Sequence, residues 1–256
     1  MTIAIERIAS LRAVSLDEIN ELADLQTRID RKYIVESVVV DALVASLPDS
    51  VGVLEIAGRR CFRYESVYFD TPGLLLYRAA ALRRRKRFKV RSRLYADSLE
   101  AMLEVKSKGG RGHTVKTRCE YPIDDRKRLT PTGREFVKSV VGPSELIVDL
   151  VPTMTTTYRR TSLVEQHSGS RLTIDLDVQC SDWLGAIASI GDVVLETKSS
   201  GSASLFDRWL WSVGIRPVKL SKYCTAMAVL HEQLPSNKWH RTKQAFAVGD
   251  LPKTHS

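Results

Sequence analysis

The sequence has few cysteines, and their positions argue against two kinds of site. Among the 256 residues there are four, Cys61, Cys119, Cys180 and Cys224, and none lies close to another in the sequence. Zinc sites and the disulfide frameworks of small secreted domains both use paired or regularly spaced cysteines. We therefore expect neither, and a reducing compartment, the cytoplasm, is the default location.

Long apolar segments are also lacking. No run approaches the roughly 18 residues that a membrane-spanning helix needs. The first 18 residues contain no apolar core of a signal peptide. We expect a cytoplasmic protein with no intrinsic membrane segment, and the sequence leaves association with a separate membrane protein open.

What the sequence does have is an excess of positive charge. Lysine and arginine total 39 and aspartate and glutamate total 30, so the formal charge is 39 − 30 = +9. This balance suggests an anionic partner. Aromatic residues make up only 7% and do not alternate with the basic strand positions, so stacking on bases is poorly supported and no nucleic acid is expected.

Hydrophobic spacing predicts helices and strands in alternation. Helices are expected over residues 16–26, 37–46, 131–141 and 202–213, with a Ser15–Glu18 capping box before the first and Ser202 capping the last. Strands are expected over 28–34, 61–70, 87–95, 100–107, 113–121, 155–164, 171–178 and 192–198. The polar tail from about residue 235 is expected to be loosely held.

The predicted strands carry charge on one face. In the strand over 87–95, Arg87, Lys89, Arg91 and Arg93 point one way, and mainly apolar residues point the other. A single strand of this kind is typical of a half-exposed sheet whose charges face water. Seven such strands in one chain favour a different arrangement, in which helices cover the apolar faces and the charged faces turn inward.

We therefore predict an α+β fold, a closed antiparallel β-barrel of about eight strands with helices packed outside. Cations gathered in its lumen repel one another and need a dense polyanion, for which a chain of phosphates is well suited. Single carboxylates lie among the cations, at Asp30, Glu104, Glu120, Asp175 and Glu196. Carboxylates can hold Mg²⁺ or Mn²⁺, which bridges to phosphate oxygens, so the pattern predicts metal-assisted phosphoryl chemistry.

Eight short motifs follow one another along the chain. They are RIDRKY at 28–33, SVYFDT at 66–71, KVRSRLY at 89–95, LEVKSK at 103–108, YRRTSL at 158–163, RLTIDLD at 171–177, LETK at 195–198 and KLSKY at 219–223. In this order the sequence resembles the VTC domain of polyphosphate polymerases, within the triphosphate tunnel metalloenzyme (CYTH-like) superfamily. The resemblance implies a tunnel domain over residues 25–232, between a helical lead-in at 1–24 and a polar tail at 233–256.

The resemblance also implies which residues form the site. Catalytic roles are implied for Lys32, Arg91, Arg93, Lys106, Arg160 and Lys198, which contact the phosphate chain. Further substrate-binding positions are Lys116, Arg118, Arg171, Ser221 and Lys222. Glu196 is implied as the principal ligand of Mn²⁺ or Mg²⁺, with Glu104 and Asp30 as further metal candidates.

The beginning of the motif set separates two branches of the superfamily. The wider superfamily begins with Glu-x-Glu-x-Lys, whereas this chain reads Arg28-Ile29-Asp30-Arg31-Lys32. An arginine in place of the first glutamate, as in VTC-like sequences, favours the polymerase branch over the hydrolase branch.

The resemblance thus implies a metal-dependent phosphotransferase that moves the γ-phosphoryl group of ATP onto a growing inorganic polyphosphate chain. Its partners are then ATP and polyphosphate. Two alternatives stay open at this point. One is a hydrolase of inorganic triphosphate, an RNA 5′ triphosphate or thiamine triphosphate, and the other is a non-catalytic polyphosphate-binding module.

Overall fold

The computed structural model describes residues 2–22, 29–108 and 114–250, and the chain divides into two compact units. Unit 1 comprises Met1–Phe62, Arg159–Val178 and Ile190–Leu220, and unit 2 comprises Arg63–Tyr158, Gln179–Ser189 and Ser221–Ser256. Strands β8 (Val151–Glu165) and β9 (Arg171–Asp182) contribute residues to both units. Parts of both units lie within the predicted domain over residues 25–232.

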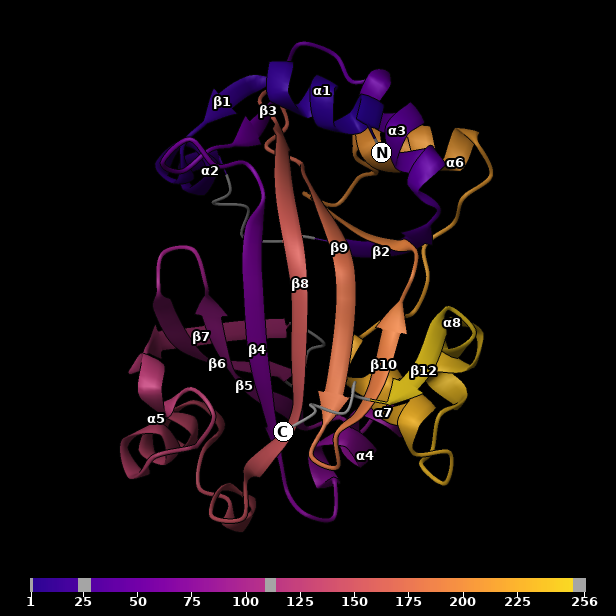
Figure 1. Cartoon of the computed structure of the whole chain (residues 1–256). Helices are drawn as coiled ribbons and strands as arrows, with labels where there is room; N and C mark the ends of the chain where they lie inside the picture. The colour runs from indigo at the N-terminus through magenta and orange to yellow at the C-terminus, as the bar shows by residue number, and fades with distance from the viewer. Residues whose placement is uncertain (1, 23–28, 109–113, 251–256) are drawn as a thin grey trace, which may run out of the picture. The chain divides into compact units, whose positions relative to one another are not determined.

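Unit 1 is organised around strand β11 (Val193–Ser199). This strand pairs antiparallel with β2 (Ile29–Val35) on one side and with β9 on the other. Strand β3 (Val51–Leu54) pairs antiparallel with β8 and parallel with β1 (Arg12–Val14). The α-helices described in this unit are α1 (Thr2–Ser10), α2 (Leu16–Leu22), α3 (Ser37–Ala45) and α6 (Leu205–Ser212), labelled in Figure 1.

The core of unit 1 lies between the apolar face of its strands and helices α3 and α6. Alternation along the strands directs Tyr33, Leu195 and Ile174 into this core, where they join Leu43 and Phe206 from the helices. Each fully buried side chain of this size stabilises the fold by about 1.5–3 kcal/mol. The opposite face of β2, β11 and β9 carries the charged residues that alternate with this apolar set.

Unit 2 contains four consecutive antiparallel strands. They are β4 (Phe62–Asp70), β5 (Arg87–Tyr95), β6 (Glu100–Lys108) and β7 (Thr114–Glu120). Helix α5 (Pro131–Val141) covers their apolar face, where Val137 packs with Val90, Leu103 and Val105. At Gly133 an added Cβ would lie 2.9 Å from the Tyr121 hydroxyl, so only glycine allows the close approach.

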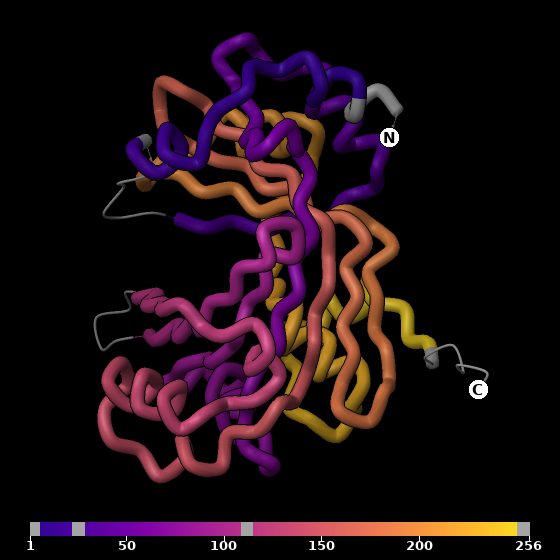
Figure 2. The backbone as a smooth tube through the Cα atoms, turned by 60° about the vertical axis from the view of Figure 1, so that its left-hand side comes forward, coloured from indigo at the N-terminus to yellow at the C-terminus, as the bar shows by residue number. Residues whose placement is uncertain are grey.

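The rest of unit 2 is built from shorter elements. They are α4 (Leu75–Ala81), β10 (Ala186–Ile190), α7 (Lys222–Leu230), α8 (His240–Lys243), β12 (Phe246–Asp250) and the 3-10 turns η1 (Ile123–Asp125), η2 (Glu145–Ile147) and η3 (Asn237–Trp239). Strand β9 turns back into β10, and the hairpin is visible in orange in Figure 2.

The buried carboxylate of Asp70 joins α4 to α7. It accepts hydrogen bonds from the backbone N–H groups of Thr71, Leu76 and Tyr77 at 2.7–2.9 Å and from the Tyr223 hydroxyl at 2.7 Å. Burial raises the pKa of Asp70 despite these four donors. Asp70 therefore supplies capping interactions that the N-cap residue Leu74 does not provide.

The predicted strands are present, with ends that differ by no more than four residues from the expected ones. Helix α5 has the predicted bounds, and the Ser15–Glu18 capping box forms with bonds of 2.8 and 3.1 Å. The prediction of Ser202 as the cap of α6 was wrong, because Ser204 forms a capping box with Asp207. Residues 23–28 and 109–113, at the edges of three predicted elements, lie outside the described residues.

The fold is α+β, with a predominantly antiparallel sheet and helices packed on its apolar faces, as predicted. Over the described ranges the sheet has 12 strands rather than about eight, and its main order is β12-β10-β9-β8-β4-β5-β6-β7. No pairing joins β12 to β7 among the described residues, so this path is not closed. Four short strands, β1, β3, β10 and β12, account for the higher count.

The C-terminal segment is structured as far as Asp250, so the prediction of a loosely held tail was wrong over this part. Leu234, Trp239 and Phe246 are buried, and β12 pairs with β10. Because the C-terminal segment is mostly polar, its sequence did not indicate that these three residues are buried. Residues 251–256 lie outside the described part of the chain.

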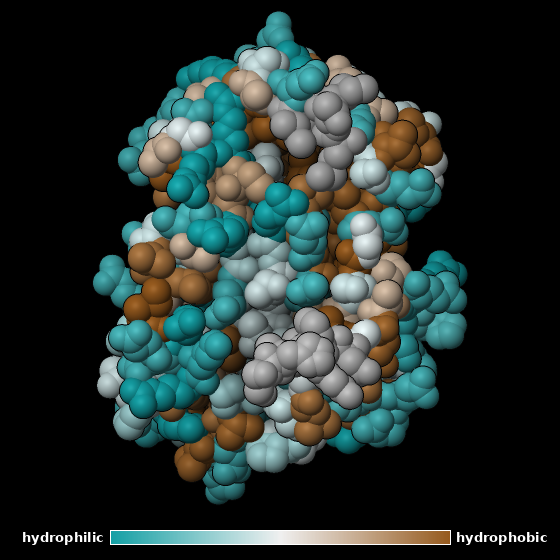
Figure 3. Space-filling model, in the orientation of Figure 1, coloured by the Kyte–Doolittle hydropathy of each residue, from teal (hydrophilic) through white to brown (hydrophobic). Residues whose placement is uncertain are grey.

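The surface is largely hydrophilic on the face shown in Figure 3, with hydrophobic residues in separate patches. None of the helices described has both the length and the apolar character that crossing a membrane requires.

Candidate functional site

The first group of candidate residues lies in unit 2, on the face of β5, β6 and β7 that α5 does not cover. Strand pairing places Arg91 opposite Glu104, and Glu104 opposite Arg118. The alternation that buries Val90 and Leu103 under α5 directs Arg91 and Glu104 to the other face. Register therefore brings cations from two strands to a carboxylate on the strand between them.

Three cations surround the Glu104 carboxylate, which is only 2% exposed. Arg91 contacts Oε2 through Nε at 2.7 Å and through its terminal nitrogen at 2.6 Å. Lys116 Nζ lies 2.5 Å from Oε1, and an Arg93 nitrogen lies 4.0 Å from the same oxygen. We call Arg91, Arg93, Glu104 and Lys116 the Glu104 cluster.

The electrostatics of the Glu104 cluster reflect burial and close opposite charge. Desolvation opposes ionisation of Glu104, but Arg91, Arg93 and Lys116 together hold its pKa well below the usual range. Desolvation lowers the pKa of Lys116 to about 8, because the attraction of Glu104 offsets it only in part and the two arginines repel the charge. Glu104 is thus ionised at neutral pH. Lys116 loses its proton over a pH range just above neutral.

Tyrosine side chains hold the two arginines in place. The Tyr68 hydroxyl accepts a hydrogen bond from Arg91 at 2.9 Å, and the Tyr158 hydroxyl accepts one from Arg93 at 3.2 Å. Tyr158 stacks on Tyr64 with ring centroids 5.2 Å apart, and Lys222 Nζ lies 4.4 Å from the centroid of the Tyr158 ring. Tyr158 therefore connects Lys222 to the Glu104 cluster.

The remaining candidates of unit 2 lie around this cluster. Lys89 donates a hydrogen bond to Ser221 Oγ at 2.8 Å, and Ser221 in turn caps helix α7. Lys106 is exposed on β6 and is paired in register with Lys89 and Lys116. Arg118 is exposed on β7.

The second group of candidates lies in unit 1, on the charged face of β2, β11 and β9. Glu196 on β11 is in register with Lys32 on β2, and Lys198 is in register with Asp30 and Arg171. The Glu196 oxygens lie 3.9 Å from Lys32 Nζ and 3.9 Å from Lys198 Nζ. We call Lys32, Glu196 and Lys198 the Glu196 cluster.

Arg160 and Asp175 form a second charged pair in unit 1. Two nitrogens of Arg160 donate to the two oxygens of Asp175 at 2.6 and 2.8 Å, a bidentate contact with a fully buried carboxylate. Arg171 donates to the backbone carbonyl of Ile19, and Asp30 is exposed. Asp175 thus fixes the orientation of Arg160, a predicted catalytic residue.

Asp207 anchors these strands from the opposite face. It accepts hydrogen bonds from the hydroxyls of Tyr33 and Thr197, both at 2.6 Å, and from Arg31 at 3.1 Å. Burial opposes its ionisation, but the hydrogen bonds from Thr197, Tyr33 and Ser204 lower the pKa of Asp207 overall. One carboxylate on α6 thereby joins β2 and β11, the two strands that carry the Glu196 cluster.

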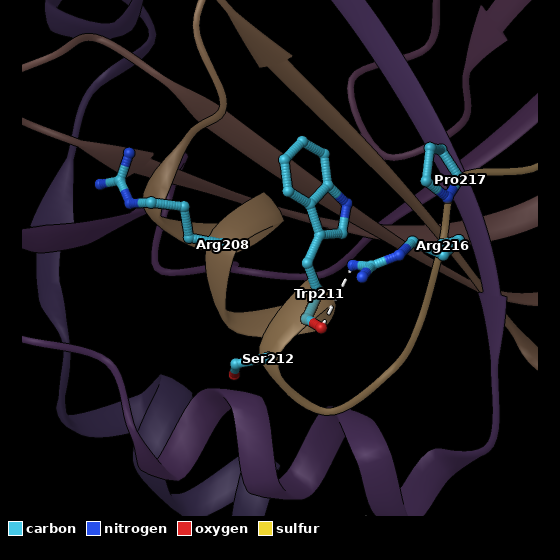
Figure 4. A pocket seen from close by; sticks show the side chains of 5 residues that line it. All are labelled: Arg208, Trp211, Ser212, Arg216 and Pro217. Carbon is cyan, nitrogen blue, oxygen red and sulfur yellow. Dashed lines mark hydrogen bonds between the residues drawn. The ribbon is translucent and has the colours of Figure 1, made fainter.

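A shallow pocket of about 570 Å³ lies at the end of α6 in unit 1. It is lined by Arg208, Trp211, Ser212, Arg216 and Pro217, and Arg216 donates a hydrogen bond to the Trp211 carbonyl (Figure 4). None of these five residues was predicted as a site residue.

The carboxylates predicted as metal ligands differ in their surroundings. No group of three or more His, Cys, Asp or Glu side chains suited to a metal occurs among the described residues. Mg²⁺ and similar ions often use one or two protein carboxylates and complete their coordination with water and substrate phosphates. Glu196, 15% exposed, fits this use, whereas Glu104 is enclosed by three cations.

Sequence reasoning missed several residues that shape these clusters. Tyr68 and Tyr158 were not predicted as site residues. Lys89 was placed only on the charged face of its strand, and Asp175 was considered only among the carboxylates that could hold a metal. Lys89 shares the alternating face of Arg91 and Arg93, so that signal was present in the sequence. The tyrosines became recognisable only when strand pairing showed what they contact.

The chain matches one family model and is similar to several solved structures. The sequence model of the VTC domain matches residues 27–231. No curated protein sequence matches at a significant level. Among solved structures, a putative adenylate cyclase from Vibrio parahaemolyticus is similar over 73% of this chain and 87% of that one, with 11% identity and a TM-score of 0.43.

A putative adenylyl cyclase from Hippeastrum, described as having a dominant triphosphatase activity, is 15% identical. The similarity covers 78% of this chain and 94% of that one, with a TM-score of 0.44. A conserved hypothetical protein from Pyrococcus furiosus is 14% identical over 73% of this chain and 88% of its own, with a TM-score of 0.38.

Proposed function

The chain belongs to the VTC domain family, and on that premise we propose that it is a polyphosphate polymerase that uses ATP. The observation that carries the proposal is the Glu104 cluster, where three cations surround one buried carboxylate. The cluster keeps a net charge of 3 − 1 = +2 at neutral pH. Such a site favours a ligand with closely spaced negative charges, and a phosphate chain is one.

In this proposal the cations divide between binding and orienting the phosphates. The residues assigned to catalysis are Lys32, Arg91, Arg93, Lys106, Arg160 and Lys198, and those assigned to further phosphate contacts are Lys116, Arg118, Arg171, Ser221 and Lys222. Glu104 and Asp175 act as positioning residues, because each holds arginine side chains in a fixed orientation. The closed tunnel expected from the sequence and a cytoplasmic location are part of the same proposal.

The reaction requires little covalent chemistry from the protein. An oxygen of the terminal phosphate of the growing chain attacks the γ-phosphorus of ATP and forms a new P–O bond. The bond from the γ-phosphorus to the β–γ bridging oxygen breaks, and ADP leaves. The attacking oxygen is already ionised near neutral pH, so no protein base is needed, and catalysis consists of positioning and charge stabilisation.

The proposed metal is Mn²⁺ or Mg²⁺, held by Glu196. When bound there it would neutralise phosphate charge and act as a Lewis acid on phosphate oxygens. Lys32 and Lys198, each 3.9 Å from the Glu196 carboxylate, would orient both that carboxylate and the phosphates. Asp30, in register with Lys198, is the second metal candidate proposed on this face.

Incubation of the purified chain with ATP and Mn²⁺, followed by sizing of the product on a gel, tests the proposal. We expect long phosphate polymers and ADP. A double variant, Arg91→Gln with Arg93→Gln, should abolish polymer formation, whereas Lys127→Gln, at an exposed cation of unit 2, should retain it. Release of free phosphate without polymer would identify a triphosphatase instead, and polyphosphate binding without turnover would identify a non-catalytic module.

A further inference from the structure

A dense group of cations in unit 2 lies outside the clusters described above. Helix α4 ends at Ala81, and the chain reaches β5 through Arg83, Arg84, Arg85 and Lys86, all of which are exposed. We call these four residues the basic turn. Arg83 has a φ of 54°, a left-handed conformation that favours glycine, so an arginine here is not explained by the backbone.

Further cations gather around the basic turn. Arg87 donates a hydrogen bond to the Arg84 carbonyl at 2.5 Å, and Lys238 donates one to the Ala80 carbonyl at 3.0 Å, at the end of α4. Burial, followed by repulsion from Lys89, Arg87 and Arg83, lowers the pKa of Lys238 to about 8. The cations around Lys238 are therefore close enough to one another for their repulsion to affect its titration.

The basic turn continues directly into the charged row of β5. Arg87, Lys89, Arg91 and Arg93 alternate along one face, spaced by about 6.6 Å for every second residue. Exposure falls along this row, from the exposed basic turn, through the half-buried Arg87, to the 8% exposed Arg93. Successive cations therefore lead from solvent to the Glu104 cluster.

We propose that the basic turn, with Lys238, is a docking site for the part of a polyphosphate chain that extends beyond the Glu104 cluster. The proposal rests on the proposed function, since it extends the same phosphate-binding face. The proposal predicts that binding affinity depends on the length of the polyphosphate chain. A long chain contacts both the cluster and the basic turn, whereas a triphosphate contacts the cluster alone.

The surroundings of the basic turn favour a phosphate chain over other polyanions. Single-stranded nucleic acid is usually held by exposed aromatic rings as well as cations. The ring of Trp239, beside Lys238, is instead 2% exposed, and Phe88 packs against the core under α5. An anionic lipid surface would need the basic turn only, and would leave the continuous row along β5 without a role.

The experiment measures binding in the full chain with Arg84→Gln and Lys86→Gln combined. The matched control combines Lys127→Gln with Lys138→Gln, two cations of unit 2 outside the basic turn, and so removes the same charge. The probes are tripolyphosphate and long-chain polyphosphate, titrated over a range of salt concentrations. Single-stranded RNA and vesicles containing phosphatidylserine serve as competing polyanions.

A cation that pairs with a phosphate of a single-stranded polyanion contributes about 0.7 to the slope of log affinity against log salt. Loss of two such contacts should therefore lower the slope for long-chain polyphosphate by about 1.4. At about 0.1 M salt the affinity should fall on the order of 25-fold. Affinity for tripolyphosphate should change by less than about twofold, and the control variant should behave as wild type.

Three results would overturn the inference. An equal loss in the control variant would indicate a general charge effect, and an equal loss for tripolyphosphate would make the basic turn part of the central site. A loss confined to RNA or vesicles would assign the surface to a different polyanion. Because binding needs no turnover, the chain-length effect can be present even if ATP yields no polymer, which would refute the proposed function alone.

Discussion

The Glu104→Gln substitution is the sharpest test of the unit 2 cluster. Glutamine keeps the shape of the side chain but removes the charge that offsets Arg91, Arg93 and Lys116. Loss of one partner from a buried ion pair typically costs 3–5 kcal/mol, because the remaining charge is buried without compensation. The three cations keep side-chain exposures of 23%, 9% and 33%, so water solvates them in part. We therefore expect the lower end, a loss of about 3 kcal/mol.

Urea unfolding measures this loss as a shift in midpoint at constant slope. A second titration with saturating tripolyphosphate should reduce the difference between variant and wild type, since the anion restores negative charge beside the cations. The matched control is Glu135→Gln on α5, where the carboxylate is 74% exposed and lies 3.8 Å from Lys138. That exposed pair should contribute less than about 1 kcal/mol.

The same carboxylate predicts a pH dependence of stability. The folded pKa of Glu104 is lower than its unfolded value of about 4.3, so its contribution to stability is complete above that value. It is lost as the pH falls from about 4.3 toward the folded pKa, and Glu104→Gln should remove this part of the acid sensitivity. A variant within about 0.5 kcal/mol of wild type, unaffected by tripolyphosphate, would refute the role given to Glu104.

Three further predictions concern other residues of the two units. Tripolyphosphate binding should weaken from about pH 7 to about pH 9 as Lys116, with a pKa of about 8, loses its charge, and Lys116→Arg should flatten this dependence in calorimetric titrations. Glu196→Gln should abolish Mn²⁺-dependent polymer formation while leaving the thermal unfolding temperature within a few degrees of wild type. Asp207→Asn should lower the free energy of unfolding by about 2–3 kcal/mol, because buried donors on Tyr33, Thr197 and Arg31 lose a charged acceptor.

Each of these predictions has an outcome that contradicts it. An unchanged pH profile in Lys116→Arg would show that another group titrates. Full Mn²⁺-dependent activity in Glu196→Gln would remove Glu196 as the metal ligand. An Asp207→Asn variant as stable as wild type would show that the Asp207 hydrogen bonds do not stabilise unit 1.

Part of the site could be predicted from the sequence, because the alternation of side chains along a strand is a local pattern. Alternation in β5 placed Arg91 and Arg93 on the face opposite Val90, and the structure has this strand with the predicted bounds. Alternation also placed Glu196 and Lys198 on one face of β11, whose bounds differ from the predicted ones by one residue at each end. Alternation depends only on the two-residue repeat of an extended chain, so a single segment is enough to reveal it.

Helices α4 and α7 were not predicted from the sequence. Helix α4 has its capping carboxylate at Asp70, several residues before its first turn, and begins after a left-handed Leu74. Helix α7 is buried along most of its length, so it lacks the apolar stripe that marks a surface helix. Helix α4 is stabilised by packing and by its hydrogen bonds to Asp70. Helix α7 is stabilised by packing and by its Ser221 cap.

The sequence by itself determined eight of the 12 strands of the described residues, the charged faces of strands such as β5 and β11, and that the chain carries the motifs of the VTC domain family. Only the tertiary structure decided that Lys116 rather than Arg118 reaches Glu104, and that Asp175 fixes Arg160. It also decided that Tyr158 connects Arg93 with Lys222. The physical reason is that these contacts depend on the register between strands and on side chains from distant segments, neither of which a local repeat can encode.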